Sequence, residues 1–555
     1  MRSETITSRA WLIALAIVAL GVALRLPGML GWWVNPDEGT YFSMVTWDEW
    51  SRFWQEVAAH AHPPLYYVLL RLVGFLTHDI SWLRSVALIS GSIAIFLAWL
   101  VGRELGERGT VGTVAGLFAA LIVAISPGAI LMSQIMRPYS LQLVFFLAAF
   151  LALLRYRRES GIGDLVLYSV GLSLALLTHY SSIFVLATFG ALIGFDLIAG
   201  KLERRLIPQL LLAHLGPALI LVGLYLFHLR PHLLDSRLAS EALEVWLEHL
   251  MIDSVADVWL NLLGFFGYLV GSWLAGPALL VFLVGVGVAL WRRSWSLAVL
   301  SLVAIGISVF AAAVGKYPFG SCRQSTWLIG FLVFPLAWAP ALALTSRRRV
   351  AVGGLVVLLV LVGLGPQVGA LMGAEQTQLE PNSEQVLSGI DLASVTEVFK
   401  AVSEPGLLLL SHQSYYLLVP FFETERQSAV RYPESNFFRF RWGARDVLVS
   451  EEWEFTLRPE ELHEDDHLFN FVLAVDRELP ELLLPEQRRV LMFFGGWSTE
   501  TPNALQSANR QLPPESPLAR PLAEVEGFRA LEVDLATFQA SFAKLVEAGD
   551  SNPSP

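Results

Sequence analysis

A polytopic α-helical membrane protein with a C-terminal extramembrane α/β domain is the fold class that this sequence predicts, on three observations. Of its 555 residues, 55% are hydrophobic and 16% are charged, whereas an ordinary soluble domain carries about 25% charged residues. Apolar runs of about 18 or more residues recur through the first two thirds of the chain. The last third alternates helical and strand-like stretches instead. Solid apolar runs exclude a soluble enzyme, a nucleic-acid-binding protein and a β-barrel, whose strands would alternate.

The transmembrane helices follow from the length of a bilayer crossing. Because a crossing needs roughly 17–25 predominantly apolar residues, about eleven spans are expected. No small-residue cleavage site follows the first span, which we therefore interpret as a retained helix and not as a signal peptide. The expected spans are 11–28, 82–102, 110–126, 129–154, 164–178, 181–199, 206–229, 275–291, 295–314, 325–344 and 350–371.

The orientation follows from Lys and Arg, which are concentrated in the cytoplasmic loops of membrane proteins. With a cytoplasmic N-terminus, 15 of the 24 basic residues in 1–371 fall in six short inner segments. An odd number of spans then places the C-terminal part outside, in a multi-pass protein of the plasma (bacterial inner) membrane. The inner basic residues are Arg2, Arg9, Arg103, Arg108, Arg155, Arg157, Arg158, Lys201, Arg204, Arg205, Arg292, Arg293, Arg347, Arg348 and Arg349.

Two long outer loops are expected, at 29–81 and 230–274. The first contains the apolar stretch Pro63–Thr77, which is short for a bilayer crossing, and counting it as a span would invert every later loop. We interpret it as a helix at the outer face, in a loop whose many Trp residues are typical of a membrane interface. The membrane domain then covers 1–371 and the extracytoplasmic domain covers 372–555.

The C-terminal domain is strongly acidic. Residues 372–555 hold 14 Lys/Arg against 30 Asp/Glu, while the rest of the chain holds 24 against 19. This balance argues against a nucleic-acid partner. The acidic run His463–His467 is interpreted as a solvated loop, and no metal ligands are assigned in this chain. The expected elements are helices at Ser383–Ser403 and Leu535–Ala548 and strands at Gly406–Ser411, Phe469–Asp476, Arg489–Phe494 and Phe528–Asp534.

The first polar motif follows the first span, where residues 35–41 read Asn-Pro-Asp-Glu-Gly-Thr-Tyr. Asp37 is a candidate general base at the membrane surface, with Glu38 beside it. The alternative is an ordinary helix N-cap, a role that Asp after Pro fills well, and the motif alone does not separate the two. Asp48 and Glu49 are interpreted as the solvated face of an interfacial helix.

Other polar groups follow along the chain. His62 precedes two prolines, and metal binding by His60 and His62 lacks a third ligand nearby. Arg137 and Tyr139 lie within an expected span near its outer third, where a charge is costly and implies a partner. The alternative for Arg137 is a side chain that snorkels to the surface.

His179 and Tyr180 fall at the outer end of their span, where Tyr is also a common interface anchor. Lys316 and Arg323 lie in a short outer loop, and they suit a phosphate or are ordinary surface charges. All these groups map to the outer side of the membrane, although the orientation of the spans was deduced from a different set of residues, the Lys and Arg of the inner segments. A carboxylate, histidines and cations at the outer leaflet suit acid/base chemistry beside an anionic lipid headgroup.

In their order along the chain, these motifs resemble the GT-C superfamily of integral-membrane glycosyltransferases. The most similar branch comprises the bacterial relatives of protein O-mannosyltransferases and of the lipid A aminoarabinose transferase. The resemblance covers about residues 1–345 and rests on residues 35–41, 62–67, 137–141 and 179–180.

The resemblance implies an inverting transfer of a sugar from a polyprenyl-phosphate donor to a hydroxyl of a glycan, lipid or protein acceptor. Asp37 would be the catalytic carboxylate, supported by Glu38, and no cofactor beyond the lipid-linked donor is implied with certainty. The aminoarabinose branch has an acidic residue and a lysine before its Pro-Pro where this chain has Ala61-His62, so that branch's donor contacts are not carried over. The implied residues of the donor phosphate and substrate site are Arg323, Lys316, Arg137, Tyr139, His62, His179 and Tyr180.

Two other function classes stay open at this point. A transporter or flippase would use the same charges as a substrate path. Against it stand the lack of an internal sequence repeat, the location of the charges on one side and the long outer loops. The other class is a scaffold whose acidic domain recruits partners. No Rossmann fingerprint or P-loop indicates a bound nucleotide.

Overall fold

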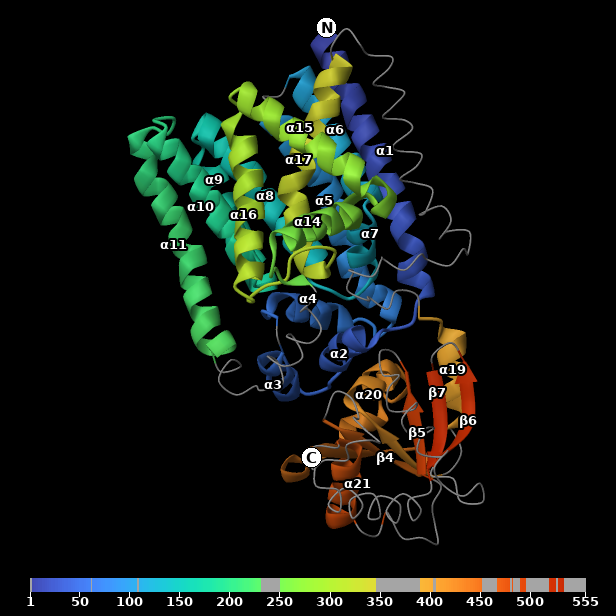
Figure 1. Ribbon diagram of the computed structural model, residues 1–555. Coiled ribbons are helices and arrows are strands. Elements are labelled where there is room, and N and C mark those ends of the chain that lie inside the picture. The colour runs from blue at the N-terminus through green and yellow to red at the C-terminus, as the bar shows by residue number, and fades with distance from the viewer. Residues whose placement is uncertain are drawn as a thin grey trace, which may run out of the picture. The chain divides into compact units, whose positions relative to one another are not determined.

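The computed structural model describes residues 2–60, 62–106, 109–230, 250–345, 390–402, 406–451, 467–479, 482, 490–495, 519–525 and 528–533. The chain divides into two compact units (Figure 1). The first comprises Met1–Leu30 and Trp54–Val386, and the second comprises Gly31–Phe53 and Leu387–Pro555. A segment of the expected outer loop 29–81 therefore belongs to the same unit as the C-terminal domain.

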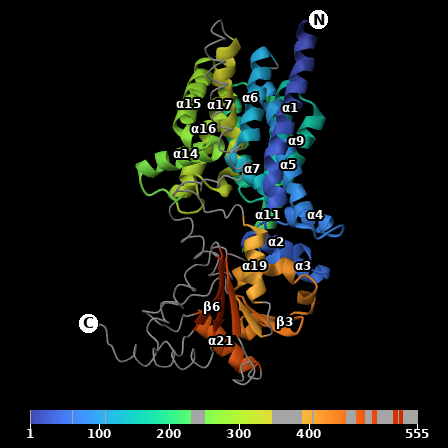
Figure 2. The same ribbon diagram turned by 90° about the vertical axis from the view of Figure 1, so that its right-hand side faces the viewer.

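The first unit is helical. Its long helices lie side by side in Figures 1 and 2, and α5 packs against α6 and α8. Short 3₁₀ or π turns are η1 (Arg204–Leu206), η2 (Tyr225–Leu229), η4 (Ser272–Leu274) and η5 (Arg323–Ser325). The α-helices, of which α3 begins in the second unit, are α1 (Arg2–Gly31), α3 (Trp50–Ala59), α4 (Leu65–Gly74), α5 (Ile80–Leu105), α6 (Thr110–Ile125), α7 (Pro127–Gln134), α8 (Tyr139–Glu159), α9 (Ile162–Thr178), α10 (Ser182–Ile198), α11 (Ile207–Leu224), α14 (Val255–Val270), α15 (Ala275–Trp291), α16 (Trp295–Ala313) and α17 (Thr326–Thr345).

The described helices agree with a polytopic membrane protein. Seven are long and apolar enough to cross a membrane, or up to eight if the bent pair α6 and α7 forms one span. Two further expected spans correspond to α9 and α10, which have 17 residues each. The expected span 350–371 lies outside the described residues. Helix α4 has 10 residues, which is about 15 Å and half a hydrocarbon core.

One expected span is wrong at its start. Residues 129–134 do not continue into α8 but belong to α7, which meets α6 at a bend of 57°. The break has a local cause: Ser126 caps α7 through the N–H of Ala129, and Pro127 occupies the first helical position. A second break before Pro138 leaves Arg137 outside both helices and not inside a helical span.

A buried cation supports the bend between α6 and α7. Arg25 of α1 is fully buried, and its guanidinium donates hydrogen bonds to the carbonyls of Val123 (3.0 Å) and Ala124 (2.9 Å). These carbonyls belong to the last turn of α6, whose carbonyls lack intrahelical donors. Arg25 also donates to Gly21 in its own helix at 2.8 Å. An Arg in the first span therefore caps the end of a distant helix.

Arg25→Leu is expected to destabilise the membrane domain by roughly 2–4 kcal/mol, because each buried carbonyl left without a donor costs about 1–3 kcal/mol. The measurement is the melting temperature of the detergent-solubilised protein. Arg9→Leu, an exposed position of the same helix, is the control. If the two variants melt together at the wild-type temperature, Arg25 does not support the bend.

The second unit contains a mixed seven-stranded sheet with strand order β2-β3-β4-β1-β5-β7-β6. Strand β1 pairs in parallel with β4 and β5, and the other pairings are antiparallel. Among the described residues of this unit, four α-helices pack with the sheet, with short turns η6 (Val419–Phe421), η7 (Glu425–Ser428) and η8 (Pro433–Ser435). The elements are α2 (Pro36–Val45), α19 (Leu392–Ala401), β1 (Leu407–Leu410), α20 (His412–Leu418), β2 (Val430–Tyr432), β3 (Phe437–Trp442), β4 (Arg445–Ser450), α21 (His467–Glu478), β5 (Val490–Phe494), β6 (Ala519–Val525) and β7 (Phe528–Val533).

Three expected strands are confirmed as β1, β5 and β7, and the described part of the helix expected at 383–403 is α19. The strand expected at 469–476 is wrong, because this segment forms α21. Its apolar residues recur at helical spacing and pack into the sheet's core at Leu468, Phe471, Val472, Val475 and Leu479. The helix expected at 535–548 and most of the acidic loop at 463–467 lie outside the described residues.

Candidate active site

The acidic pair lies at the start of α2, in the second unit. The N-cap is Asn35, whose side chain accepts a hydrogen bond from the N–H of Glu38 at 2.9 Å. The Glu38 carboxylate in turn accepts from the N–H of Asn35 at 3.4 Å, which completes a capping box. The capping role that was an alternative for Asp37 therefore belongs to its neighbours. Glu38 is fully buried and Asp37 is half-buried.

Three predicted aromatic and imidazole rings meet in the first unit. His62 lies just before α4, Tyr139 begins α8, and His179 occupies the break between α9 and α10. The ring centroids are 4.9 Å apart for His62 and His179, 4.8 Å for Tyr139 and His179, and 6.3 Å for His62 and Tyr139. We call these three residues the ring cluster. Residues far apart in sequence thus share one site.

A hydrogen-bond chain fixes the ring of His179. The amide of Gln142, on α8, donates to Ser181 Oγ at 2.7 Å, which directs the Ser181 hydroxyl towards His179 Nδ1 at 2.8 Å. The N–H of Ser181 also donates to Nδ1, at 3.1 Å. Because Nδ1 accepts both bonds, the proton of the neutral ring lies on Nε2. His179 is thereby held as a hydrogen-bond donor.

Gln142 and Ser181 were not found from the sequence. Gln142 lies one turn after Tyr139 on the same helix, in an otherwise apolar stretch. A polar side chain at such a position is itself a signal of function in membrane proteins, so the sequence contained a usable indication for Gln142. Ser181 gave no comparable signal, because Ser is common near helix starts.

Cations act on the ring cluster. Burial together with Arg323 and Arg137 lowers the pKa of His179 to about 3. Burial, followed by the charges of His179 and Arg323, holds the pKa of His62 well below its usual range. Both imidazoles are therefore neutral at physiological pH. Arg137 is buried, and Arg323 begins η5 and is half-buried.

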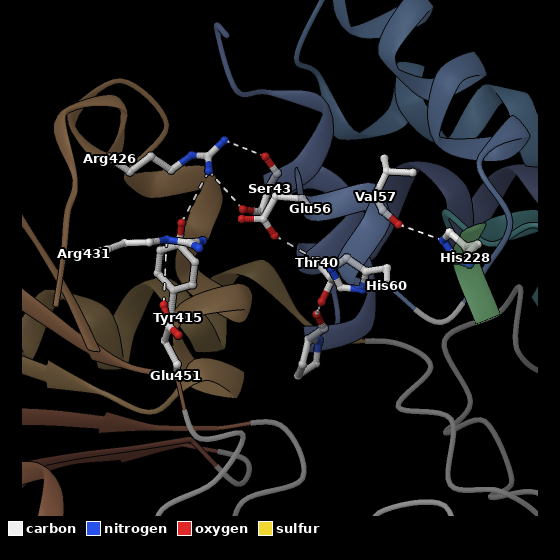
Figure 3. A network of polar contacts seen from close by, with 11 residues as sticks. Thr40, Ser43, Glu56, Val57, His60, His228, Tyr415, Arg426, Arg431 and Glu451 are labelled. Carbon is white, nitrogen blue, oxygen red and sulfur yellow. Dashed lines mark hydrogen bonds and ion pairs between the residues drawn. The ribbon is translucent and has the colours of Figure 1, made fainter. Parts of the chain in front are cut away.

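Two predicted residues lie differently. The Tyr180 hydroxyl forms a hydrogen bond of 2.5 Å with His228 Nδ1, so this tyrosine supports η2. His228 Nε2 in turn lies 3.0 Å from the carbonyl oxygen of Val57 (Figure 3). Lys316 follows α16 and is exposed, and within the described residues no hydrogen bond or ion pair involves its ammonium group. Among the described residues, no group of three or more His, Cys, Asp or Glu is placed to hold a metal ion.

Acidification is expected to destabilise the protein through His179. Its folded pKa lies below the unfolded value near 6.5, so the unfolded chain binds more protons as the pH falls. Between pH 6.5 and 5 this contribution is about 2 kcal/mol. His179→Gln removes this contribution, so its melting temperature should depend less on pH than that of wild type. His78→Gln, outside the ring cluster, should keep the wild-type pH dependence. Equal acid sensitivity in His179→Gln and wild type would contradict the assignment.

Comparison with known proteins adds a family and a fold. Residues 61–228 match the dolichyl-phosphate-mannose-protein mannosyltransferase family, a range that contains the whole ring cluster. No sequence among the curated proteins matches the chain.

Solved structures share the fold over nearly the whole chain. ArnT from Cupriavidus metallidurans in the apo state has a TM-score of 0.52 at 12% identity, covering 95% of this chain and 98% of that one. ArnT bound to undecaprenyl phosphate gives 0.51 at 13% identity with the same coverage. The oligosaccharyltransferase of Archaeoglobus fulgidus tethered with an NVT acceptor peptide gives 0.52 at 12% identity, covering 90% and 70%.

The helical membrane unit, the acidic motif after the first span and the added sheet domain define a GT-C fold. Over residues 61–228 the chain matches a GT-C family, that of the protein O-mannosyltransferases, and its fold is shared with ArnT. The family resemblance inferred from the motifs is thereby confirmed.

Proposed function

We propose that the protein transfers a sugar from a polyprenyl-phosphate donor to an acceptor hydroxyl at the outer face of the membrane, with inversion at the anomeric carbon. One observation carries the proposal. Burial and the charges of nearby cations, Arg323 and Arg137 for His179 and Arg323 for His62, keep the imidazoles of the ring cluster neutral. Hydrogen bonds also fix the His179 ring as a donor. This combination of cations and a neutral hydrogen-bond donor suits a phosphate group that is linked to a lipid.

The charge of the leaving group gives Arg323 and Arg137 a role in the reaction. When the bond between the anomeric carbon and the phosphate oxygen breaks, negative charge grows on the phosphate. Arg323 and Arg137 would stabilise that charge, and the Nε2–H of His179 would donate to it. The structure of ArnT that shares this fold holds undecaprenyl phosphate, which supports a polyprenyl phosphate as the donor lipid here.

The acidic pair, Asp37 and Glu38, would supply the general base of the reaction. The acceptor hydroxyl loses its proton as its oxygen forms the new bond to the anomeric carbon, and Asp37 would take that proton. Glu38 is committed to the capping box and so would hold the motif in shape. A hexose or a pentose is compatible with these roles, as is a hydroxyl of a glycan, a lipid or a protein.

The experiment is a transfer assay with the purified protein in liposomes. Synthetic polyprenyl-phosphate hexoses and pentoses are offered with acceptor hydroxyl compounds, and release of polyprenyl phosphate is measured. A glycosyltransferase releases the phosphate only when an acceptor is glycosylated. A transporter or flippase would move the intact donor across the bilayer without release, and that outcome would replace the proposal.

The topology is part of the proposal: N-terminus in the cytoplasm and residues 372–555 outside. Because Lys and Arg favour cytoplasmic loops, reporter fusions at Arg157 and Arg204 should report the cytoplasm. A fusion at Ala374 should report the opposite side. Fusions at Arg157 and Ala374 on the same side would show that the number of spans is even between them.

A further inference from the structure

Arg426 of η7 is a fully buried cation in the second unit, and its contacts lie at the end of α2. It donates to Ser43 Oγ at 3.0 Å, to the carbonyl of Ser43 at 2.9 Å and to the Thr46 hydroxyl. Figure 3 shows its guanidinium pointing to Ser43, with the Tyr415 hydroxyl 3.5 Å away. The same group stacks 4.2 Å from the ring centre of Trp47.

The chemistry of these contacts is that of a helix C-cap. Helix α2 ends at Val45, so the carbonyl of Ser43 belongs to the last turn, where a cation is favoured by the helix dipole. Within the described residues, the polar contacts of Arg426 are to hydroxyl and carbonyl oxygens and not to a carboxylate. The buried charge of Arg426 is therefore compensated by the C-terminal end of α2 and by the indole ring of Trp47.

Further contacts hold α2 along its length. A Cβ at Gly39 would lie 1.9 Å from the carbonyl oxygen of Tyr416, so α2 packs directly on the backbone of α20. Gln427 donates to the carbonyl of Thr46 at 2.8 Å and accepts from the N–H of Asp48 at 3.2 Å. Ahead of the helix, the indole of Trp33 donates to the carbonyl of Leu417 at 2.9 Å.

We infer that the C-terminal domain positions the catalytic carboxylate, with Arg426 as the positioning residue. The inference rests on the proposed function, in which Asp37 is the base. Helix α2 has 10 residues and is about 15 Å long, so a shift at its C-terminal end moves its N-terminal turn as well. Misplacing a reacting group by about 1 Å costs on the order of 10² in rate.

The test is a double-mutant cycle on turnover. Arg426→Met should lower kcat roughly 10–100-fold and leave the KM for the donor near wild type. Arg426→Lys should recover part of the loss, because it keeps the charge. Arg431→Met is the control, since Arg431 is an exposed neighbour with a long 3.8 Å contact to Glu451 (Figure 3); it should leave kcat unchanged.

The Asp37→Asn background separates positioning from general destabilisation. If Arg426 acts through Asp37, Arg426→Met adds little to the loss already caused by Asp37→Asn. If Arg426→Met multiplies the loss in that background, or leaves kcat of the single variant unchanged, the inference is wrong. If Arg426→Met does not fold, Gln427→Ala, which removes the contacts of Gln427 with Thr46 and Asp48 at the same end of α2, takes its place with the same expectations. An active Asp37→Asn protein would instead overturn the proposed base.

Discussion

Asp37→Asn is expected to fold, insert and bind the donor, and to lose on the order of 10²–10⁴ in turnover, the usual contribution of a general base. The amide keeps the shape of the side chain but does not accept the acceptor's proton. Stability should be unaffected, because Asn35 and Glu38, and not Asp37, form the capping box of α2. The measurements are kcat in the liposome assay and the melting temperature of the same preparation.

Two variants serve as controls for Asp37→Asn. Asp48→Asn changes an exposed carboxylate that follows α2, and its turnover should stay near wild type. Glu38→Gln keeps a side chain that serves the capping box, so its loss should be modest. Near-normal transfer by Asp37→Asn would shift the base to Glu38, and near-normal transfer by both variants would place the base outside this acidic pair.

The membrane helices were predictable because the bilayer imposes a minimum apolar length. Ten of the eleven expected segments contain a described helix, and the eleventh, 350–371, lies outside the described residues. The bend between α6 and α7 was not predictable from apolarity, since both helices are apolar. It depends on Pro127 and on a cap that Arg25 supplies from a distant span.

The site was predictable in its residue types but not in its contacts. The predicted orientation of the spans places His62, Tyr139 and His179 on the outer side of the membrane. Only the structure shows that their ring centroids lie within 6.3 Å of one another. The role of Glu38 also needed geometry, because a capping box is a pair of hydrogen bonds and not a composition. Lys316 was predicted beside Arg323 as a phosphate-binding cation, but its side chain is exposed.

The C-terminal domain shows a different limit. Strands β1, β5 and β7 are short apolar runs, and such runs predict strands. The Phe and Val residues of α21 have high β propensity and therefore also predict a strand, although the segment is helical. Its helical spacing becomes decisive only when the core that it faces is known. No local pattern indicates that Arg426 contacts Ser43, since 383 residues separate them in sequence.

Arg323→Ala is expected to weaken donor binding by about 2–3 kcal/mol, the range for losing a hydrogen bond to a charged group. Arg323→Lys should recover only part of this, because an ammonium group does not form the bidentate contact with a phosphate. The measurement is the affinity for polyprenyl phosphate in nanodiscs. Arg292→Ala, an exposed cation after α15, is the control and should bind as wild type.

A second measurement separates a local role of Arg323 from loss of fold. Because the charge of Arg323 lowers the pKa of both His62 and His179, Arg323→Ala should raise both pKa values, which NMR of labelled imidazoles can follow. Lys316→Ala should affect donor affinity less than Arg323→Ala, since its side chain is exposed. If Arg323→Ala raises the imidazole pKa values but leaves the affinity for polyprenyl phosphate unchanged, Arg323 lies beside the ring cluster without binding the donor, and Arg137 becomes the principal candidate for the phosphate.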